Sequence, residues 1–90
     1  MDYLMVAVKD TCAGIFMNPM YVENEEVAKR TFASQGKNIN IWKENPKQFE
    51  LYNLGKINKE TGVIIGNDEG PLEEPVLHPE YICSLADLIG

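Results

Sequence analysis

Several residue patterns that would indicate a chemical site are missing from this chain. It has only two cysteines, and Cys12 and Cys83 stand too far apart for the C-x-x-C spacing of a redox or zinc motif. The glycines form no phosphate-binding loop, because Gly55, Gly62 and Gly66 fit neither of the common glycine-rich patterns. We therefore expect no metal, no cofactor and two ordinary thiols in a reducing compartment.

A catalytic dyad is not evident either. His78 is the single histidine, and it lies between Leu77 and Pro79 in an acidic segment. An acid or base role would require a partner and a pocket, so a solvated or capping histidine is the simpler interpretation. A nucleophile built from Cys12 or Cys83 with His78 is the remaining alternative, but nothing around either cysteine indicates thiolate activation. We expect a binding protein rather than an enzyme.

Long apolar runs are also absent. None approaches the roughly 20 residues needed to cross a bilayer, and the N-terminus has no basic segment of the kind found in signal peptides. We therefore expect no membrane association and a cytoplasmic location. A chain of 90 residues with 44% apolar residues indicates one globular domain with a modest core. Oligomerisation, most simply a homodimer, would add buried surface.

Positive charge is missing from the C-terminal part of the chain. All eight lysine and arginine residues precede residue 60, and acidic residues balance them within residues 1–67. Residues 68–90 contain acidic residues and no lysine or arginine, which accounts for the net charge of −6. The sequence predicts a core domain over 1–67, followed by an acidic linker and amphipathic tail over 68–90. A strongly basic surface for nucleic acid is excluded.

The strongest local signal is a hairpin. A turn at Asn45-Pro46 leads into a β-rich run over Phe49–Ile57. A polar turn that ends on Gly62 then leads back into residues 63–65, since glycine can adopt the positive φ that a hairpin loop needs. The alternation of apolar residues changes phase near Asn53. Either both faces of this strand are partly covered, or a bulge lies there.

The N-terminal half predicts two strands and a helix. Tyr3–Lys9 is almost continuously apolar, which is typical of a central strand covered on both faces. After a turn over residues 10–14, Ile15–Val22 predicts an antiparallel strand, with Pro19 placing it at an edge or at a bulge. Asn24 is a good helix N-cap, and we expect the helix to end near Gly36.

The C-terminal segment predicts a short amphipathic helix that begins at Pro79. Its apolar stripe must dock on its own sheet, on a second copy or on a partner protein, and its candidate protein-interaction residues are Tyr81, Ile82, Leu85 and Leu88. The predicted fold is therefore α+β, in the order β-β-α-β-β. It has a mainly antiparallel four-stranded sheet, one packed helix and the short C-terminal helix.

Lysine and arginine residues alternate with aromatic residues in the middle of the chain. Single-strand binding uses this combination, because cations follow the phosphates while rings stack on the bases. Dispersed lysines are also typical of a solvated surface, and aromatic residues in a small domain are often core. The candidate nucleic-acid-binding residues are Lys29, Arg30, Trp42, Lys43, Lys47, Tyr52, Lys56 and Lys59.

Across residues 5–65 the order and spacing of particular residues resemble one family. They are Val8-x-Asp10, Ala13, Phe16, Pro19, Asn24, Ala28, Phe32, Asn45-Pro46, Phe49-x-Leu51-Tyr52-x-Leu54-Gly55 and Thr61-Gly62. The chain is similar to the small nonstructural protein of gokushovirus-type microviruses, which are single-stranded DNA phages. It departs from that family at residues 56–59, where an acidic hairpin is typical, and after Gly70.

The resemblance implies a phage nonstructural protein in the cytoplasm of the infected bacterial host. It implies a role in viral single-stranded DNA replication or in the switch to packaging, through DNA or through a viral or host replication protein. The alternative function is a protein-interaction module, either an assembly factor or a host-modulating protein, that acts through the C-terminal apolar helix.

Overall fold

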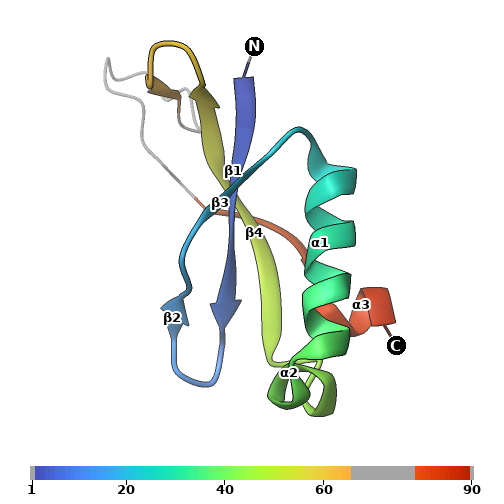
Figure 1. Ribbon diagram of the computed structural model, residues 1–90. Coiled ribbons are helices and arrows are strands. Elements are labelled where there is room, and N and C mark those ends of the chain that lie inside the picture. Colours follow the sequence, from blue (N-terminus) through green and yellow to red (C-terminus); the bar gives the residue numbers. More distant parts are fainter. Residues whose placement is uncertain (1, 66–78, 90) are drawn as a thin grey trace.

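The computed structural model describes residues 2–65 and 79–89, which form one antiparallel sheet with helices packed against it (Figure 1). The expected α+β fold is confirmed. The elements in chain order are β1 (Asp2–Asp10), β2 (Ile15–Phe16), β3 (Met20–Val22), α1 (Glu25–Asn38), α2 (Asn40–Glu44), β4 (Phe49–Asn58), β5 (Ile64–Ile65), β6 (Glu80–Ser84) and α3 (Leu85–Ile89).

Two long strands form the centre of the sheet. β1 and β4 pair antiparallel over almost their whole length, from Asp2 opposite Asn58 to Asp10 opposite Phe49. The short strands β2 and β3 both pair with β1, and β5 and β6 both pair with β4. The sheet therefore has four strand positions, as expected, and each outer position is divided between two short strands.

The strand expected over Ile15–Val22 is interrupted in its middle. Pairing with β1 stops after Phe16 and resumes at Met20, so residues 17–19 belong to neither β2 nor β3. Pro19 has no N–H to donate to a neighbouring strand, which is tolerated at a sheet edge. The Met17 N–H still donates to the Val8 carbonyl oxygen at 2.7 Å. The predicted edge position and the predicted irregularity are both confirmed.

The hairpin between β4 and β5 follows its turn chemistry. The side-chain oxygen of Asn58 accepts the N–H groups of Glu60 at 2.9 Å and Thr61 at 3.1 Å. Gly62 has a φ of 75°, the left-handed conformation for which glycine was expected. The polar residues of the turn thus satisfy its backbone locally, and the chain reverses into β5.

A β-bulge explains the change of phase in β4. Asn53 lies opposite Val6, but the next paired residue is Gly55 opposite Met5, so Leu54 is an extra residue in the strand. Gly55 has a φ of 143°, which a residue with a side chain rarely adopts. The bulge alternative is therefore the correct one. Phe49 and Leu51 precede the bulge and face the core together by ordinary alternation, and the extra residue changes the phase after Asn53.

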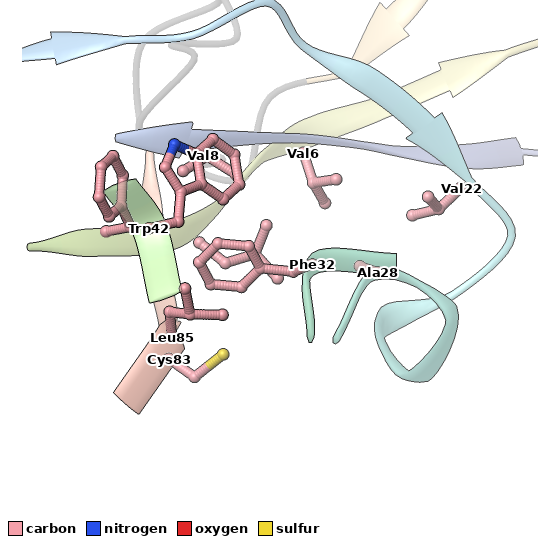
Figure 2. Packing of buried hydrophobic residues seen from close by; sticks show 10 residues of the cluster. Val6, Val8, Val22, Ala28, Phe32, Trp42, Cys83 and Leu85 are labelled. Atoms are coloured by element: carbon pink, nitrogen blue, oxygen red, sulfur yellow. The ribbon is translucent and has the colours of Figure 1, made fainter. Parts of the chain in front are cut away.

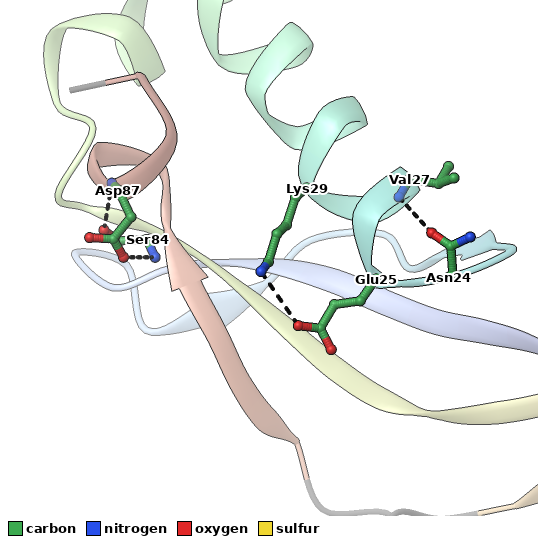
Figure 3. Close-up of polar contacts among 6 residues, drawn as sticks. All are labelled: Asn24, Glu25, Val27, Lys29, Ser84 and Asp87. Atoms are coloured by element: carbon green, nitrogen blue, oxygen red, sulfur yellow. Dashed lines mark hydrogen bonds and ion pairs between the residues drawn. The ribbon is translucent and has the colours of Figure 1, made fainter.

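Helix α1 begins where the sequence predicts. The Asn24 side-chain oxygen accepts the Val27 N–H at 2.9 Å (Figure 3). One turn further on, the Lys29 ammonium nitrogen lies 3.6 Å from a carboxylate oxygen of Glu25. Ala28 and Phe32 are fully buried, as their shared stripe indicated.

The predicted end of α1 at Gly36 is wrong, because the helix continues to Asn38. Gly36 is buried, and a Cβ placed on it would lie only 2.5 Å from a methyl carbon of Leu85. This glycine therefore does not end the helix. It provides the space that lets α1 and α3 pack closely together.

All three helices contribute to one core on one face of the sheet (Figure 2). The helices supply Phe32, Trp42 and Leu85, while the strands supply Val6 and Leu51, among others. Side chains alternate between the two faces of a strand. In β1, Val6 and Val8 face the core, so Met5 and Ala7 project to the opposite face. Among the described residues, no helix covers that opposite face, which we call the open face.

The C-terminal segment differs from its prediction. Residues 80–84 form strand β6, which pairs antiparallel with β4, and only Leu85–Ile89 are helical. Pairing satisfies backbone groups along the outer side of β4 that a helix would leave free. The change of structure occurs at Ser84, whose N–H donates to the Asp87 carboxylate at 2.9 Å (Figure 3). Residues 79–89, assigned to a tail in the sequence analysis, thus complete the sheet and the core; residues 68–78 of the predicted linker lie outside the described residues.

Candidate nucleic-acid interface

The open face is built from alternate residues of the central strands. Val6 and Val8 of β1 face the core, so Met5, Ala7 and Lys9 project to the open face. Met5 is 8% exposed and Ala7 only 1%, although no helix in the described part of the chain covers them. In the strand register Ala7 lies opposite Tyr52, and Met5 opposite Tyr21. The open face therefore has an apolar floor between large aromatic side chains.

Three aromatic side chains form a row across this face, and we call Phe16, Tyr52 and Tyr81 the aromatic row. They come from β2, β4 and β6, and the strand register places Phe16 opposite Lys9 and Tyr81 opposite Tyr52. The ring centroids of Phe16 and Tyr52 are 5.2 Å apart, and those of Tyr52 and Tyr81 are 5.8 Å apart, both edge-to-face. Phe16 is 40% exposed and Tyr81 is 50% exposed. The row thus presents ring surface to solvent across the width of the sheet.

Cations lie among these rings. The Lys9 ammonium nitrogen is 5.5 Å from the ring centroid of Phe16 and 6.0 Å from that of Tyr52. At the hairpin end of the same face, Lys59 lies 5.1 Å from the ring of Tyr3. A positive charge beside exposed rings is the arrangement that single-stranded nucleic acid requires, because phosphates and bases alternate along it.

The phenol groups of the row stay neutral at physiological pH. Burial raises the pKa of Tyr52, and the hydrogen bond that its hydroxyl donates to Glu50 at 3.0 Å raises it further. Desolvation also raises the pKa of Tyr81, and the negative charge of Asp87 adds to the shift. Neither ring therefore brings a phenolate to a face that would meet phosphate groups.

Trp42 requires a correction as a stacking residue. It is 7% exposed, and its ring stacks on Phe49 at 4.9 Å and meets Phe32 edge-to-face at 6.0 Å. The ring fills the core beneath α1, because α2 points it inward (Figure 2). The ring is therefore not a stacking platform on the open face. Tyr52, the other predicted stacking residue, does lie on the open face.

The predicted cations do not form one patch. Lys29 and Arg30 lie on α1 and Lys43 on α2, in the helical layer that packs on the opposite face. Lys47 precedes β4, while Lys56 and Lys59 lie at its far end. A ten-residue strand rises about 3.3 Å per residue, so roughly 33 Å separates the two ends.

The predicted protein-interaction residues are mostly internal. Leu85 is fully buried against Gly36, and Ile82 and Leu88 pack against the same core. Leu85 is therefore corrected from an interaction residue to a core residue, because α3 docks on α1 of its own chain. Tyr81 is exposed, but it belongs to the aromatic row.

Sequence reasoning missed Lys9, Phe16 and Tyr21 on the open face. Their positions depend on the pairing of β1 with β2 and β3, which no local pattern specifies. The alternation of Tyr3, Met5, Ala7 and Lys9 was one available signal, although a continuous apolar strand conceals it.

The thiols provide no support for a nucleophilic site. Cys12 is exposed in a turn, whereas Cys83 is buried in the core. Burial raises the pKa of the Cys83 thiol, which disfavours the thiolate that a nucleophile requires. His78, the proposed base of the alternative dyad, lies outside the described residues.

The fold and this face together define a small α+β protein with its helices on one side of a sheet and exposed rings on the other. No helix in the described ranges is both long and apolar enough to cross a membrane. The family profile described as Phage ORF5 protein matches residues 3–88. The chain therefore belongs to the Phage ORF5 protein family and is a small phage protein. No curated protein and no solved structure gave a significant match.

Proposed function

We propose that this phage protein binds single-stranded DNA on the open face of its sheet. The observation that carries the proposal is the aromatic row of Phe16, Tyr52 and Tyr81, with the Lys9 ammonium beside two of its rings. Stacking of a base on an aromatic ring contributes about 1–3 kcal/mol. Bases within a duplex are already stacked on each other, so the row favours a single strand over a duplex.

The biological role that follows is non-enzymatic. The protein would act in viral single-stranded DNA replication or in its switch to packaging, in the cytoplasm of the infected bacterial host. Family membership supports the assignment to a phage, and the resemblance to gokushovirus-type microviruses supports the more specific assignment. During replication of a duplex one strand is displaced as single-stranded DNA, and a protein that covers this strand would keep it from serving as a template. A homodimer would offer two aromatic rows to the same strand.

Titration of a labelled oligonucleotide, followed by fluorescence anisotropy, tests the proposal. We expect a single strand to bind more tightly than the matching duplex. Phe16→Ala and Tyr81→Ala should each weaken binding about tenfold, since each removes one exposed ring. Arg30→Gln on α1 is the matched control and should bind as the unmodified protein does. Equal affinity for single strand and duplex, or unchanged binding by both ring variants, would contradict the proposal.

A protein partner is the second candidate function. The exposed rings of Phe16, Tyr21 and Tyr81 on a partly apolar face would also suit a viral or host replication protein. This candidate uses the open face rather than the C-terminal helix, since Leu85 of that helix is buried. Absence of oligonucleotide binding at low salt, with the fold intact, would favour the partner protein.

A further inference from the structure

A cavity of about 560 Å³ opens at the edge of the sheet, where β2 and β3 are interrupted. Val8, Met17, Met20 and Trp42 supply apolar walls to it. The cavity lies beside the interruption, because Met17 and Asn18 line it and α1 and α2 each supply one further lining residue.

Polar groups stand among these apolar walls. The amide side chains of Asn18 and Gln35 line the cavity, and among the described residues no hydrogen bond engages either of them. Figure 2 shows the indole nitrogen of Trp42 on the β1 side of its ring, and Val8 of β1 lines the same cavity. In the described part of the chain every fully buried side-chain nitrogen or oxygen has a hydrogen-bond partner. The Trp42 N–H has no acceptor there, so it is not among the fully buried groups and keeps some exposure to solvent.

These groups suit the edge of a nucleic-acid base. A base is a flat ring that packs between apolar walls, and its edge carries the donors and acceptors that amide side chains recognise. Asn18 is exposed and Gln35 is half-buried, so both amides can hydrogen-bond to a ligand that enters from solvent, and a hydrocarbon ligand would use neither. The lining therefore favours a base over a lipid chain or an aliphatic side chain.

The cavity lies on the core side of the sheet, since Val8, Met20 and Trp42 line it, whereas the aromatic row lies on the open face. Phe16, at the sheet edge, belongs to the row and also lines the cavity, so a single strand would pass from one to the other around the edge at residues 17–19.

We propose that the cavity receives one base of a single strand bound on the aromatic row, and that Gln35 and Asn18 read its edge. This inference rests on the proposed function. It adds base preference to a face that by stacking alone would accept any base.

Trp42 is the single tryptophan of the chain, so its fluorescence reports directly on the cavity. The experiment titrates the full chain with four homo-oligonucleotides, one for each base, and records anisotropy and tryptophan fluorescence together. We expect one base to bind about tenfold more tightly than the weakest, and its binding to change the Trp42 emission.

Gln35→Leu keeps the size of the side chain and removes its amide. We expect this variant to reduce the ratio between the affinities of the strongest and the weakest oligonucleotide several-fold. Asn18→Ala, in the exposed break of the edge strand, provides a second variant that does not alter α1. Ser34→Ala is the control, because Ser34 is exposed on α1 and does not line the cavity.

The outcomes separate this inference from the proposed function. If all four oligonucleotides bind equally and the Trp42 emission does not change, the cavity assignment is wrong and the aromatic row still stands. If preference exists but survives both Gln35→Leu and Asn18→Ala, these residues do not read the base and the inference is overturned. If no oligonucleotide binds, the proposed function fails and the cavity assignment fails with it.

Discussion

Gly36 shows how much one residue can decide in a chain of this size. In a helix interior alanine is more stable than glycine by up to about 1 kcal/mol, so helix propensity alone predicts that Gly36→Ala stabilises the protein. The new Cβ would instead meet the side chain of Leu85, which is fully buried and has little room to move. We expect Gly36→Ala to lower the free energy of unfolding by roughly 1–3 kcal/mol, measured by chemical denaturation.

A double-mutant cycle provides the control for Gly36. Leu85→Ala alone should cost about 2–5 kcal/mol, because it leaves a cavity in the core. In the double variant Gly36→Ala/Leu85→Ala the added methyl group occupies part of that cavity. The loss of unfolding free energy in the double variant should therefore be smaller than the sum of the losses in the two single variants. Strictly additive costs would show that the contact between α1 and α3 is absent in solution.

Asp10 links stability to pH. Its carboxylate accepts hydrogen bonds from the Gln48 side chain at 2.8 Å and from the N–H groups of Cys12 and Ala13. These bonds, that of Gln48 foremost, hold the pKa of Asp10 below its usual value near 4. A pKa that is lower in the folded state than in the unfolded state stabilises the fold at neutral pH, and this contribution is lost as the pH falls below about 4.

The corresponding prediction concerns the melting temperature. Asp10→Ala should melt below the unmodified protein at neutral pH, and the difference should shrink as the pH falls below about 4, when the carboxylate becomes protonated. Asp2→Ala is the control, since that exposed side chain makes no hydrogen bond among the described residues. A difference that does not depend on pH would mean that the charge of Asp10 does not stabilise the turn.

Among the elements, the β6–α3 segment has a structural role that its sequence does not reveal. β6 pairs with β4 from Glu50 to Asn53, and α3 inserts Leu85 into the core. We therefore expect deletion of residues 79–90 to abolish cooperative thermal unfolding, as followed by circular dichroism. Tyr81→Ala, which removes an exposed ring from the same strand, should leave the transition in place. A truncated chain that still unfolds cooperatively would restore the interpretation of this segment as a separate tail.

For the whole molecule, charge determines how strongly the proposed DNA binding depends on salt. The net charge is −6, and in the described part of the chain Lys9 and Lys59 are the cations that lie over rings of the open face. Two phosphate contacts on a single strand give a slope of about −1.4 in a plot of log affinity against log salt concentration. We expect this shallow slope in anisotropy titrations, and a slope shallower by about 0.7 for Lys9→Gln. A steep slope would indicate that the dispersed lysines of the helical layer contact the strand as well.

The sequence by itself determined the features that depend on a few neighbouring residues. The N-cap at Asn24, the Asn58–Gly62 turn and the break at Pro19 were predictable, because each results from a backbone restriction or a short-range hydrogen bond. The α+β class was predictable for the same reason, since the apolar periods of the main strands and of α1 lie within single segments.

Only the tertiary structure decided the rest. Residues 80–84 became a strand because the outer side of β4 was open to pairing. The residues with which they pair lie about 30 positions earlier in the chain, so no local pattern reveals them. Trp42 became a core residue because α2 docks under α1, and the aromatic row exists because the register of three strands brings Phe16, Tyr52 and Tyr81 together. Strand register is fixed by long-range burial and pairing, so a candidate binding face made across strands cannot be found from local patterns.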